Sequence, residues 1–252
     1  MNRFFRLSSA SAIALATLPA AALAHDFFLL PSSGTGGTTV VGTVGSTFPN
    51  PEIAVTPDRV ATARGATASG PIDVRVGTVS GKTLPVIIAS SAQPAIVSLA
   101  LKPRDVEYRD DRIDLIMDEY PVGANARAAV ARLPRPRLLK VDSRRYAKTA
   151  ICPQSCLGLA KIAAQGLELE FVAVADGRFR LLENGSPVAS HEAIAATSDG
   201  KRQRVTTDAR GEIALPISTA GPVMLFASTM ASPSSPEGRF VLRLTSFTVN
   251  AR

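Results

Sequence analysis

Residues 240–249 read Phe-Val-Leu-Arg-Leu-Thr-Ser-Phe-Thr-Val, and this stretch near the carboxyl end decides the interpretation of the fold. Its first apolar residues alternate, so in a strand they share one face: Phe240, Leu242 and Leu244. Phe247 and Val249 are odd-numbered, so in a regular strand their side chains point to the opposite face. A β-bulge near Thr245-Ser246 would return all five side chains to a single inward face. The alternative is a strand that is buried on both faces at its end.

Alternation with a period of two also occurs elsewhere in the chain. The alternating apolar sets are Ile72, Val74 and Val76; Leu167, Leu169 and Phe171; Phe179 and Leu181; and Ile213, Leu215 and Ile217. Turn signals stand between them, including Asn184-Gly185 and the stretch 208–211, which ends in glycine. Segments of this kind predict antiparallel sandwiches, with one face of each sheet packed inward.

One stretch departs from the β pattern. Its apolar residues follow the spacing i, i+3, i+4, i+7 of a helical stripe: Ile113, Ile116, Met117 and Tyr120. Asp110 or Asp111 can cap the start of this helix, and Pro121 ends it. A second short helix is expected before Pro134, because proline stops a helix.

The first 24 residues have the features of a secretory signal. Arg3 and Arg6 precede an apolar stretch, and Ala22-Leu23-Ala24 is a small-x-small cleavage site. We therefore expect a periplasmic or secreted protein. Residues 25–252 are long enough for two domains of about 100 residues each.

The predicted fold class is mainly β, with two antiparallel, immunoglobulin-like β-sandwich domains joined by a short helical connector. The predicted ranges are the signal peptide 1–24, an amino-terminal sandwich 25–105, the connector 106–159 and a carboxy-terminal sandwich 160–252.

Composition narrows the classes of partner. The formal net charge of the whole chain is +7, but the basic residues are scattered and interpreted as a solvated face. Tryptophan is absent and aromatic residues make up 5%, which disfavours stacking platforms for bases or sugars. We expect no nucleic-acid partner. After the leader we find no apolar run of about 18 residues, so the mature chain is not expected to span a membrane.

Cys152 and Cys156 are the two cysteines of the chain. In an oxidising compartment a disulfide between them is the leading prediction. A thiolate metal site and free thiols are the alternatives. A zinc site would need a second pair of ligands nearby, and the sequence has no such pair.

His25 would become the first residue after cleavage behind Ala24. A terminal histidine offers a metal its amine and its imidazole together, and His191 is the only other histidine. The candidate metal residues are therefore His25 and His191, with copper or nickel as the candidate ions. Otherwise His25 is simply the first residue of an edge strand.

Catalysis finds little support in the residues. Ser190, His191 and Glu192 are adjacent, but neighbours on a strand point to opposite faces. There is no G-x-S-x-G elbow and no phosphate-binding glycine loop. We therefore predict no catalytic residues and no enzyme, with a secreted hydrolase as an alternative. A binding or accessory role toward an unidentified protein or small ligand is the leading expectation.

Three sets of segments resemble the DUF4198 family of secreted bacterial proteins, which has been labelled nickel-transport-like. They are the opening 25–31; the middle segments 101–104, 118–124 and 145–150; and the later segments 183–188 and 207–212 with the closing strand to Val249. The second half also resembles small immunoglobulin-like modules of the Cna-B type. The resemblance implies a seven-stranded sandwich in that half.

The chain departs from this family at two places. Many relatives carry further histidines that would be partners for a terminal histidine. Here residues 44–49 read Val-Gly-Ser-Thr-Phe-Pro, and residues 226–230 read Phe-Ala-Ser-Thr-Met, without histidine. The resemblance therefore does not supply a complete metal site.

Overall fold

The computed structural model describes residues 25–34, 37–88, 92–153, 155–215, 221–235 and 237–251. Within these ranges the chain is mainly β, as predicted. The predicted leader 1–24 and Ile217 lie outside the described residues.

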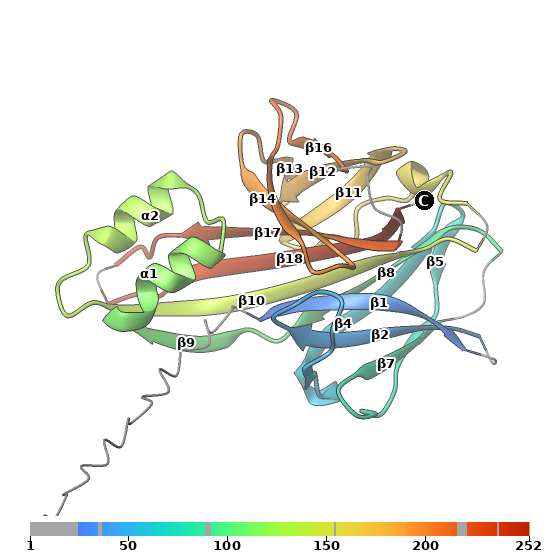
Figure 1. Cartoon of the computed structure of the whole chain (residues 1–252), viewed down its shortest axis with the longest axis horizontal. Coiled ribbons are helices and arrows are strands. Elements are labelled where there is room, and N and C mark those ends of the chain that lie inside the picture. The colour runs from blue at the N-terminus through green and yellow to red at the C-terminus, as the bar shows by residue number, and fades with distance from the viewer. Residues whose placement is uncertain are drawn as a thin grey trace, which may run out of the picture.

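A nine-stranded sheet forms the middle of the molecule (Figure 1). Its order is β15 (Arg202–Thr206), β14 (Glu192–Thr197), β17 (Gly221–Ala231), β18 (Phe240–Ala251), β10 (Leu138–Ile151), β8 (Ala95–Leu101), β4 (Val60–Thr67) and β5 (Gly70–Ile72), with β9 (Arg104–Arg109) beside the first half of β10.

Two smaller sheets are also formed by the described strands. The first joins β1 (Asp26–Gly34), β2 (Gly37–Gly45), β7 (Leu84–Ile88) and β6 (Val74–Val76), with β3 (Ile53–Ala54) beside β2. The second joins β11 (Leu169–Ala175), β12 (Arg178–Glu183) and β13 (Ser186–Pro187), with β16 (Glu212–Ala214) beside β12. The alternating set Ile72, Val74 and Val76 is therefore not one strand, because the chain passes between sheets at Asp73.

The predicted helices are confirmed, but the residue predicted to cap the first helix is wrong. Helix α1 (Asp110–Glu119) buries the predicted stripe and ends before Pro121, and α2 (Ala124–Ala131) follows. Arg109 occupies the N-cap position without a side-chain hydrogen bond. Asp110 and Asp114 instead bind the guanidinium of the buried Arg137, which holds α1 against the start of β10. Short 3₁₀ helices occupy Pro57–Arg59 and Leu159–Lys161.

The predicted β-bulge in the last strand is wrong. The pairing of β18 with β17 runs without a break from Gly221↔Ala251 to Ala231↔Val241. The alternative is confirmed, because side chains of both parities are buried along β18. Those of Leu242 and Leu244 pack with the helices, whereas those of Phe247 and Val249 pack against β11 and β12.

This double burial follows from the position of β18. It pairs with β10 in parallel, from Val141↔Phe240 to Thr149↔Thr248, in the middle of the nine-stranded sheet. One face of the two strands meets the helices and then β1, and the other face meets the four-stranded sheet (Figure 1). Strands that are buried on both faces lose the simple alternation of one-sided strands.

The nine-stranded sheet takes strands from all three predicted ranges. Strands β4, β5 and β8 lie in 25–105, β10 lies in 106–159, and β14, β15, β17 and β18 lie in 160–252. One sheet therefore runs through the predicted domains. Their division into two sandwiches stays a prediction.

The turn predictions are confirmed in the second half of the chain. Asn184 and Gly185 both have positive φ, 49° and 81°, between β12 and β13. That conformation suits a two-residue hairpin turn, because its twist matches the paired strands. Asp208 Oδ1 accepts hydrogen bonds from the amides of Arg210 and Glu212. The turn then closes at Gly211, with φ of 74°.

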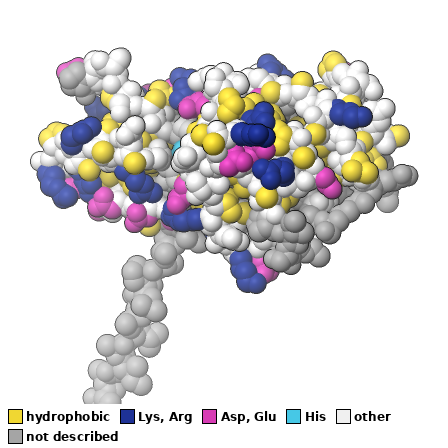
Figure 2. Space-filling model, turned by 90° about the horizontal axis from the view of Figure 1, so that it is seen from above, with side chains coloured by type: hydrophobic (Ala, Val, Ile, Leu, Met, Phe, Trp, Pro, Cys, Tyr) yellow, Lys and Arg dark blue, Asp and Glu magenta, His cyan; other side chains and the backbone are white. Residues whose placement is uncertain are grey.

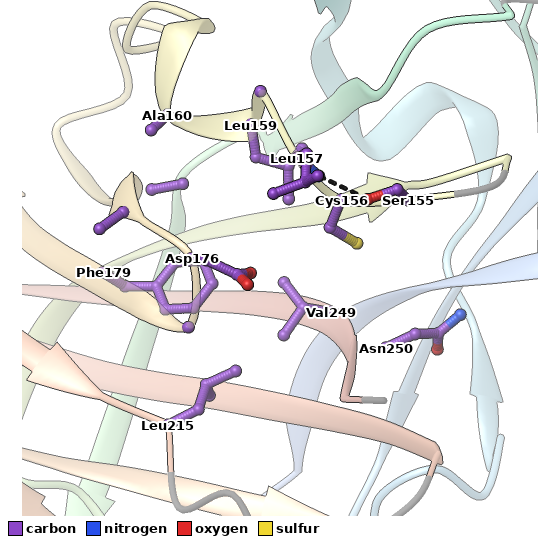
Figure 3. Close-up of a pocket in the computed structure, with 14 residues that line it drawn as sticks. Ser155, Cys156, Leu157, Leu159, Ala160, Asp176, Phe179, Leu215, Val249 and Asn250 are labelled. Atoms are coloured by element: carbon purple, nitrogen blue, oxygen red, sulfur yellow. Dashed lines mark hydrogen bonds between the residues drawn. The ribbon is translucent and has the colours of Figure 1, made fainter.

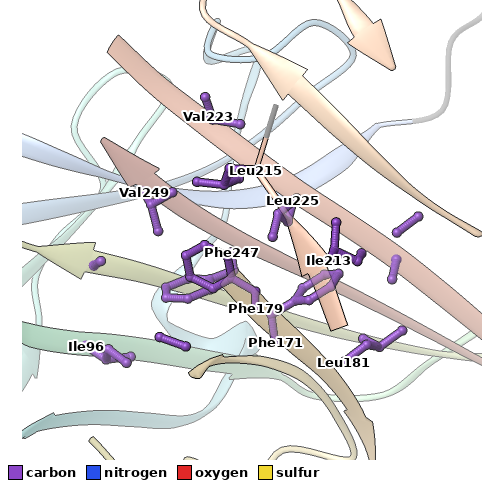
Figure 4. Packing of buried hydrophobic residues seen from close by; sticks show 14 of the residues in the cluster. Ile96, Phe171, Phe179, Leu181, Ile213, Leu215, Val223, Leu225, Phe247 and Val249 are labelled. Carbon is purple, nitrogen blue, oxygen red and sulfur yellow. The ribbon is translucent and has the colours of Figure 1, made fainter. Parts of the chain in front are cut away.

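The core between the nine-stranded and four-stranded sheets is built from aliphatic and aromatic side chains of both (Figure 4). The rings of Phe179 and Phe247 meet edge to face with centroids 5.2 Å apart. Such pairs add to the stabilisation from area burial alone. The face of β18 that carries Phe247 and Val249 thus contributes to this core.

A buried ion pair lies within the same core. Lys148 of β10 is fully buried, and its Nζ lies 2.6 Å from Glu170 Oε2 and 2.7 Å from the Phe171 carbonyl oxygen. The carboxylate of Glu170 also accepts hydrogen bonds from the amides of Gln165, Gly166 and Leu167. Burial lowers the pKa of Lys148, and the carboxylate of Glu170 opposes that shift. Each charge is thus compensated by the other and by backbone groups.

We expect Lys148→Met to lower the free energy of unfolding by about 3 kcal/mol, because it leaves a buried carboxylate without its cation. Adding Glu170→Gln should recover part of that loss, since a neutral amide oxygen still accepts the backbone hydrogen bonds. Urea denaturation measures both effects. Lys140→Met, at an exposed position of the same strand, is the control and should change stability by less than about 0.5 kcal/mol. A Lys148→Met protein as stable as the parent would contradict this account.

Candidate functional site at the amino-terminal strand

His25 lies directly before β1, on the edge of a cleft. Its Nε2 is 3.1 Å from Glu52 Oε2, and the side chain is 43% exposed. The guanidinium of Arg145, on β10, donates a hydrogen bond of 2.6 Å to the His25 carbonyl oxygen. The backbone of this residue is therefore fixed to the central sheet while the imidazole remains accessible.

Asp26 anchors the same strand to the far edge of the nine-stranded sheet. Its side chain is 2% exposed, and its Oδ2 lies 2.6 Å from Arg202 Nη1 on β15. Its Oδ1 is buried without a hydrogen-bond partner among the described residues. Burial raises the pKa of Asp26 above the ordinary 3.8, and the guanidinium of Arg202 only partly offsets this.

The cleft beside His25 has a volume of about 410 Å³ and a basic lining. Cationic residues line it from four places: Arg59 from the first 3₁₀ helix, Lys102 from the β8–β9 connection, Arg104 from the start of β9, and Arg145 from β10. Aliphatic side chains form the remaining wall: Val44, Ile53, Val55, Leu101 and Val106. No carboxylate is among the described residues that line the cleft.

Two of these cations are already engaged through the backbone. Arg59 Nη2 donates to the Lys102 carbonyl oxygen at 2.8 Å, and Arg145 binds His25. Lys102 and Arg104 are exposed, and no ion pair joins either of them to another described residue. The cleft therefore presents a lining of cationic side chains next to an apolar wall, which suits an anionic ligand with an apolar part.

His191, the second predicted metal residue, lies just before β14 with partners of its own. Its Nε2 is 2.9 Å from the Ser228 carbonyl oxygen, and its amide donates to Thr207 Oγ1. No hydrogen bond or ion pair joins His191 to His25 in the described part of the chain. Within those ranges there is also no group of three or more His, Cys, Asp or Glu side chains placed to hold a metal ion. The pairing of His25 with His191 at one metal stays a prediction.

The neighbours of His191 do not form a catalytic set in the described structure. The Glu192 carboxylate pairs with Arg204 across β14 and β15. Ser190 occupies a turn with φ of 51°. The hydrolase alternative therefore gains no geometric support from these three residues.

The predicted disulfide between Cys152 and Cys156 is present, with Cα atoms 5.0 Å apart. It closes a short loop directly after β10. The thiolate metal site and the free thiols that were its alternatives do not apply to the oxidised pair.

The sequence did not identify most of the residues around His25. Glu52 and Arg202 are far from His25 in the sequence and match no pattern. Arg145 belongs to a short basic group of the sequence and, like Lys102 and Arg104, to a segment that resembles DUF4198. In the sequence the cations of the cleft are scattered, because their convergence depends on how β8 and β10 pack beside β1.

The surface does not show a single-sign charge patch on the face seen in Figure 2, where basic and acidic side chains are interspersed. No helix in the described ranges has the length and apolar character needed to cross a bilayer. Comparisons with protein-family models, with curated proteins and with solved structures found no match. The resemblance to DUF4198 therefore stays a prediction.

Asp26 provides a test of this geometry through pH. A carboxyl whose pKa is raised in the folded state contributes stability that is lost as the pH rises through that pKa. Asparagine cannot titrate. We therefore expect the free energy of unfolding of Asp26→Asn, relative to the parent, to increase as the pH rises above about 4.

Denaturant titrations at a series of pH values measure this difference. Asp73→Asn is the matched control, because Asp73 is exposed and its stability difference should not follow the same trend. A difference for Asp26→Asn that is constant or that falls with pH would show that burial does not dominate at this carboxyl.

Proposed function

We propose that this chain is an exported, non-catalytic binding or accessory protein of the DUF4198 type that binds a small organic anion in the cleft beside His25. The observation that carries the proposal is the convergence of Arg59, Lys102, Arg104 and Arg145 on one partly apolar cavity. Arginine favours carboxylate and phosphate groups because its planar fork can form two parallel hydrogen bonds. The apolar wall would contact the rest of the ligand.

We further propose two immunoglobulin-like sandwiches, at 25–105 and 160–252, joined by the connector 106–159. Two separate core clusters support this division. One lies between the five-stranded sheet and β8, and the other lies between the four-stranded sheet and β17 and β18. A periplasmic or secreted location rests on the leader alone. In this proposal the ligand-binding surface consists of loops and strand ends on a rigid sheet, as is common in binding proteins.

The cleft is tested by isothermal titration calorimetry with succinate, a small organic anion, and with inorganic phosphate, which carries charge without an apolar part. We expect succinate to bind, with an affinity that falls as ionic strength rises. The double variant Lys102→Gln/Arg104→Gln should bind about tenfold more weakly, since two exposed charges are removed from the ligand's surroundings.

The matched control is Arg75→Gln/Lys82→Gln, which removes the same charge from exposed positions outside the cleft. Equal weakening in both double variants would mean that net charge, and not the cleft, attracts the probe. Absence of binding by the parent at about millimolar concentration would overturn the proposed ligand class.

Binding of copper or nickel by His25 is the second candidate function. The specific observation that favours it is the contact between Nε2 and Glu52, because metal-binding histidines often donate their second ring nitrogen to a carboxylate. Nδ1 and, after cleavage behind Ala24, the terminal amine would then be the donors. The surrounding cations act against a metal cation, so this candidate ranks below the anion.

Copper titration separates the two candidates. We expect an exported protein that begins at His25 to bind copper more tightly than a version with one additional alanine before His25, because the extension removes the chelate. Glu52→Gln should weaken copper binding without affecting the extended version. Equal copper binding by the native and extended proteins would exclude the chelate.

A further inference from the structure

A second cavity lies at one end of the four-stranded sheet, next to the disulfide, and the proposed function does not use it. Its volume is about 290 Å³ (Figure 3). An apolar cavity of about 150 Å³ accommodates benzene, so this space suits a fused ring or a short alkyl chain.

The walls of this cavity come from several parts of the chain. Leu157 and Leu159 lie on the segment that follows the disulfide, Leu215 directly follows β16, and Phe179 and Val249 lie on β12 and β18. The last four are buried members of the core between the sheets. The cavity is therefore an opening into the end of that core.

Small residues keep the space open. Ala160, Ala173 and Ala175 line it, and the pairing of β11 with β12 is irregular between Ala173 and Ala175. Such irregularities bend a strand and redirect its side chains. Leu157 stands at the cavity with 71% of its surface exposed, the highest among the exposed large hydrophobic residues in the described ranges. Leu157 directly follows Cys156, so the disulfide ties its backbone to the end of β10.

Asp176 is the one charged side chain among the described residues of this lining. It occupies the turn between β11 and β12, and Figure 3 shows it beside Phe179 and Val249. It is exposed, and no ion pair joins it to another residue in the described ranges. An apolar space with a free carboxylate at its mouth is complementary to a molecule that has an apolar body and a cationic head.

We propose that this cavity is a binding site for a small amphiphilic amine, with the apolar body between Leu159 and Phe179 and the ammonium at Asp176. The site differs from the cleft beside His25 in the sign of its charge and in its location. Its failure and the failure of the proposed anion site can therefore be distinguished.

The test uses three probes of one size: 1-naphthylmethylamine, which is cationic; 1-naphthylmethanol, which is neutral; and 1-naphthoate, which is anionic. Fluorescence titration of the full mature protein measures the three affinities. We expect the amine to bind about fivefold more tightly than the alcohol and the anion to bind most weakly, since one exposed carboxylate contributes modestly.

Two variants locate the binding. Asp176→Asn should remove the preference for the amine, and Ala175→Phe should weaken all three probes more than tenfold by filling the mouth of the cavity. The matched controls are Asp73→Asn and Ala61→Phe, which make the same changes at exposed positions outside the cavity. Thermal denaturation confirms that each variant is folded.

Equal binding of amine and anion by the parent would overturn the role of Asp176. Unchanged binding in Ala175→Phe would place the probes elsewhere and overturn the site. Absence of binding by all three probes at about millimolar concentration would overturn the proposal as a whole.

Discussion

The parallel pairing of β10 with β18 is the constraint on which the rest of the structure depends. It joins two strands that are distant in the sequence and places them in the middle of the nine-stranded sheet. Both faces of the pair must then be covered. The helices and β1 cover one face, and β11 and β12 cover the other. Each smaller sheet has its position because these two strands offer it a buried face.

The pair of Lys148 and Glu170 belongs to the same arrangement. Lys148 lies on β10 where that strand faces β11, and its ammonium has two acceptors within hydrogen-bond distance. Glu170 in turn orders the loop 165–167 through three backbone amides. A buried charge of this kind is costly unless it is fully paired. It therefore disfavours any other packing of β10 against β11 that would separate the two charges. Its role here is to specify the packing of the sheets.

The central strands also position the candidate site. Arg145 of β10 binds the carbonyl oxygen of His25, and Ser246 of β18 donates to that of Phe27. Arg202 at the sheet edge binds Asp26. Three successive residues, His25 and the first two of β1, are therefore held by the nine-stranded sheet. The cleft forms where this strand, the first 3₁₀ helix and the β8–β9 connection meet, so its basic lining depends on long-range packing.

The sequence by itself determined the β-rich class, both helices, the turns at Asn184-Gly185 and Gly211, and the disulfide. Each of these depends on residues that are close together in the chain. Tertiary structure decided how residues 240–249 pack, because the alternation shows which side chains share a face of the strand but not what covers that face. It also decided the convergence of Arg59, Lys102, Arg104 and Arg145 beside His25. Local sequence spacing indicates that a segment is a strand or a helix. A site assembled from separate strands forms only when those strands are paired and packed.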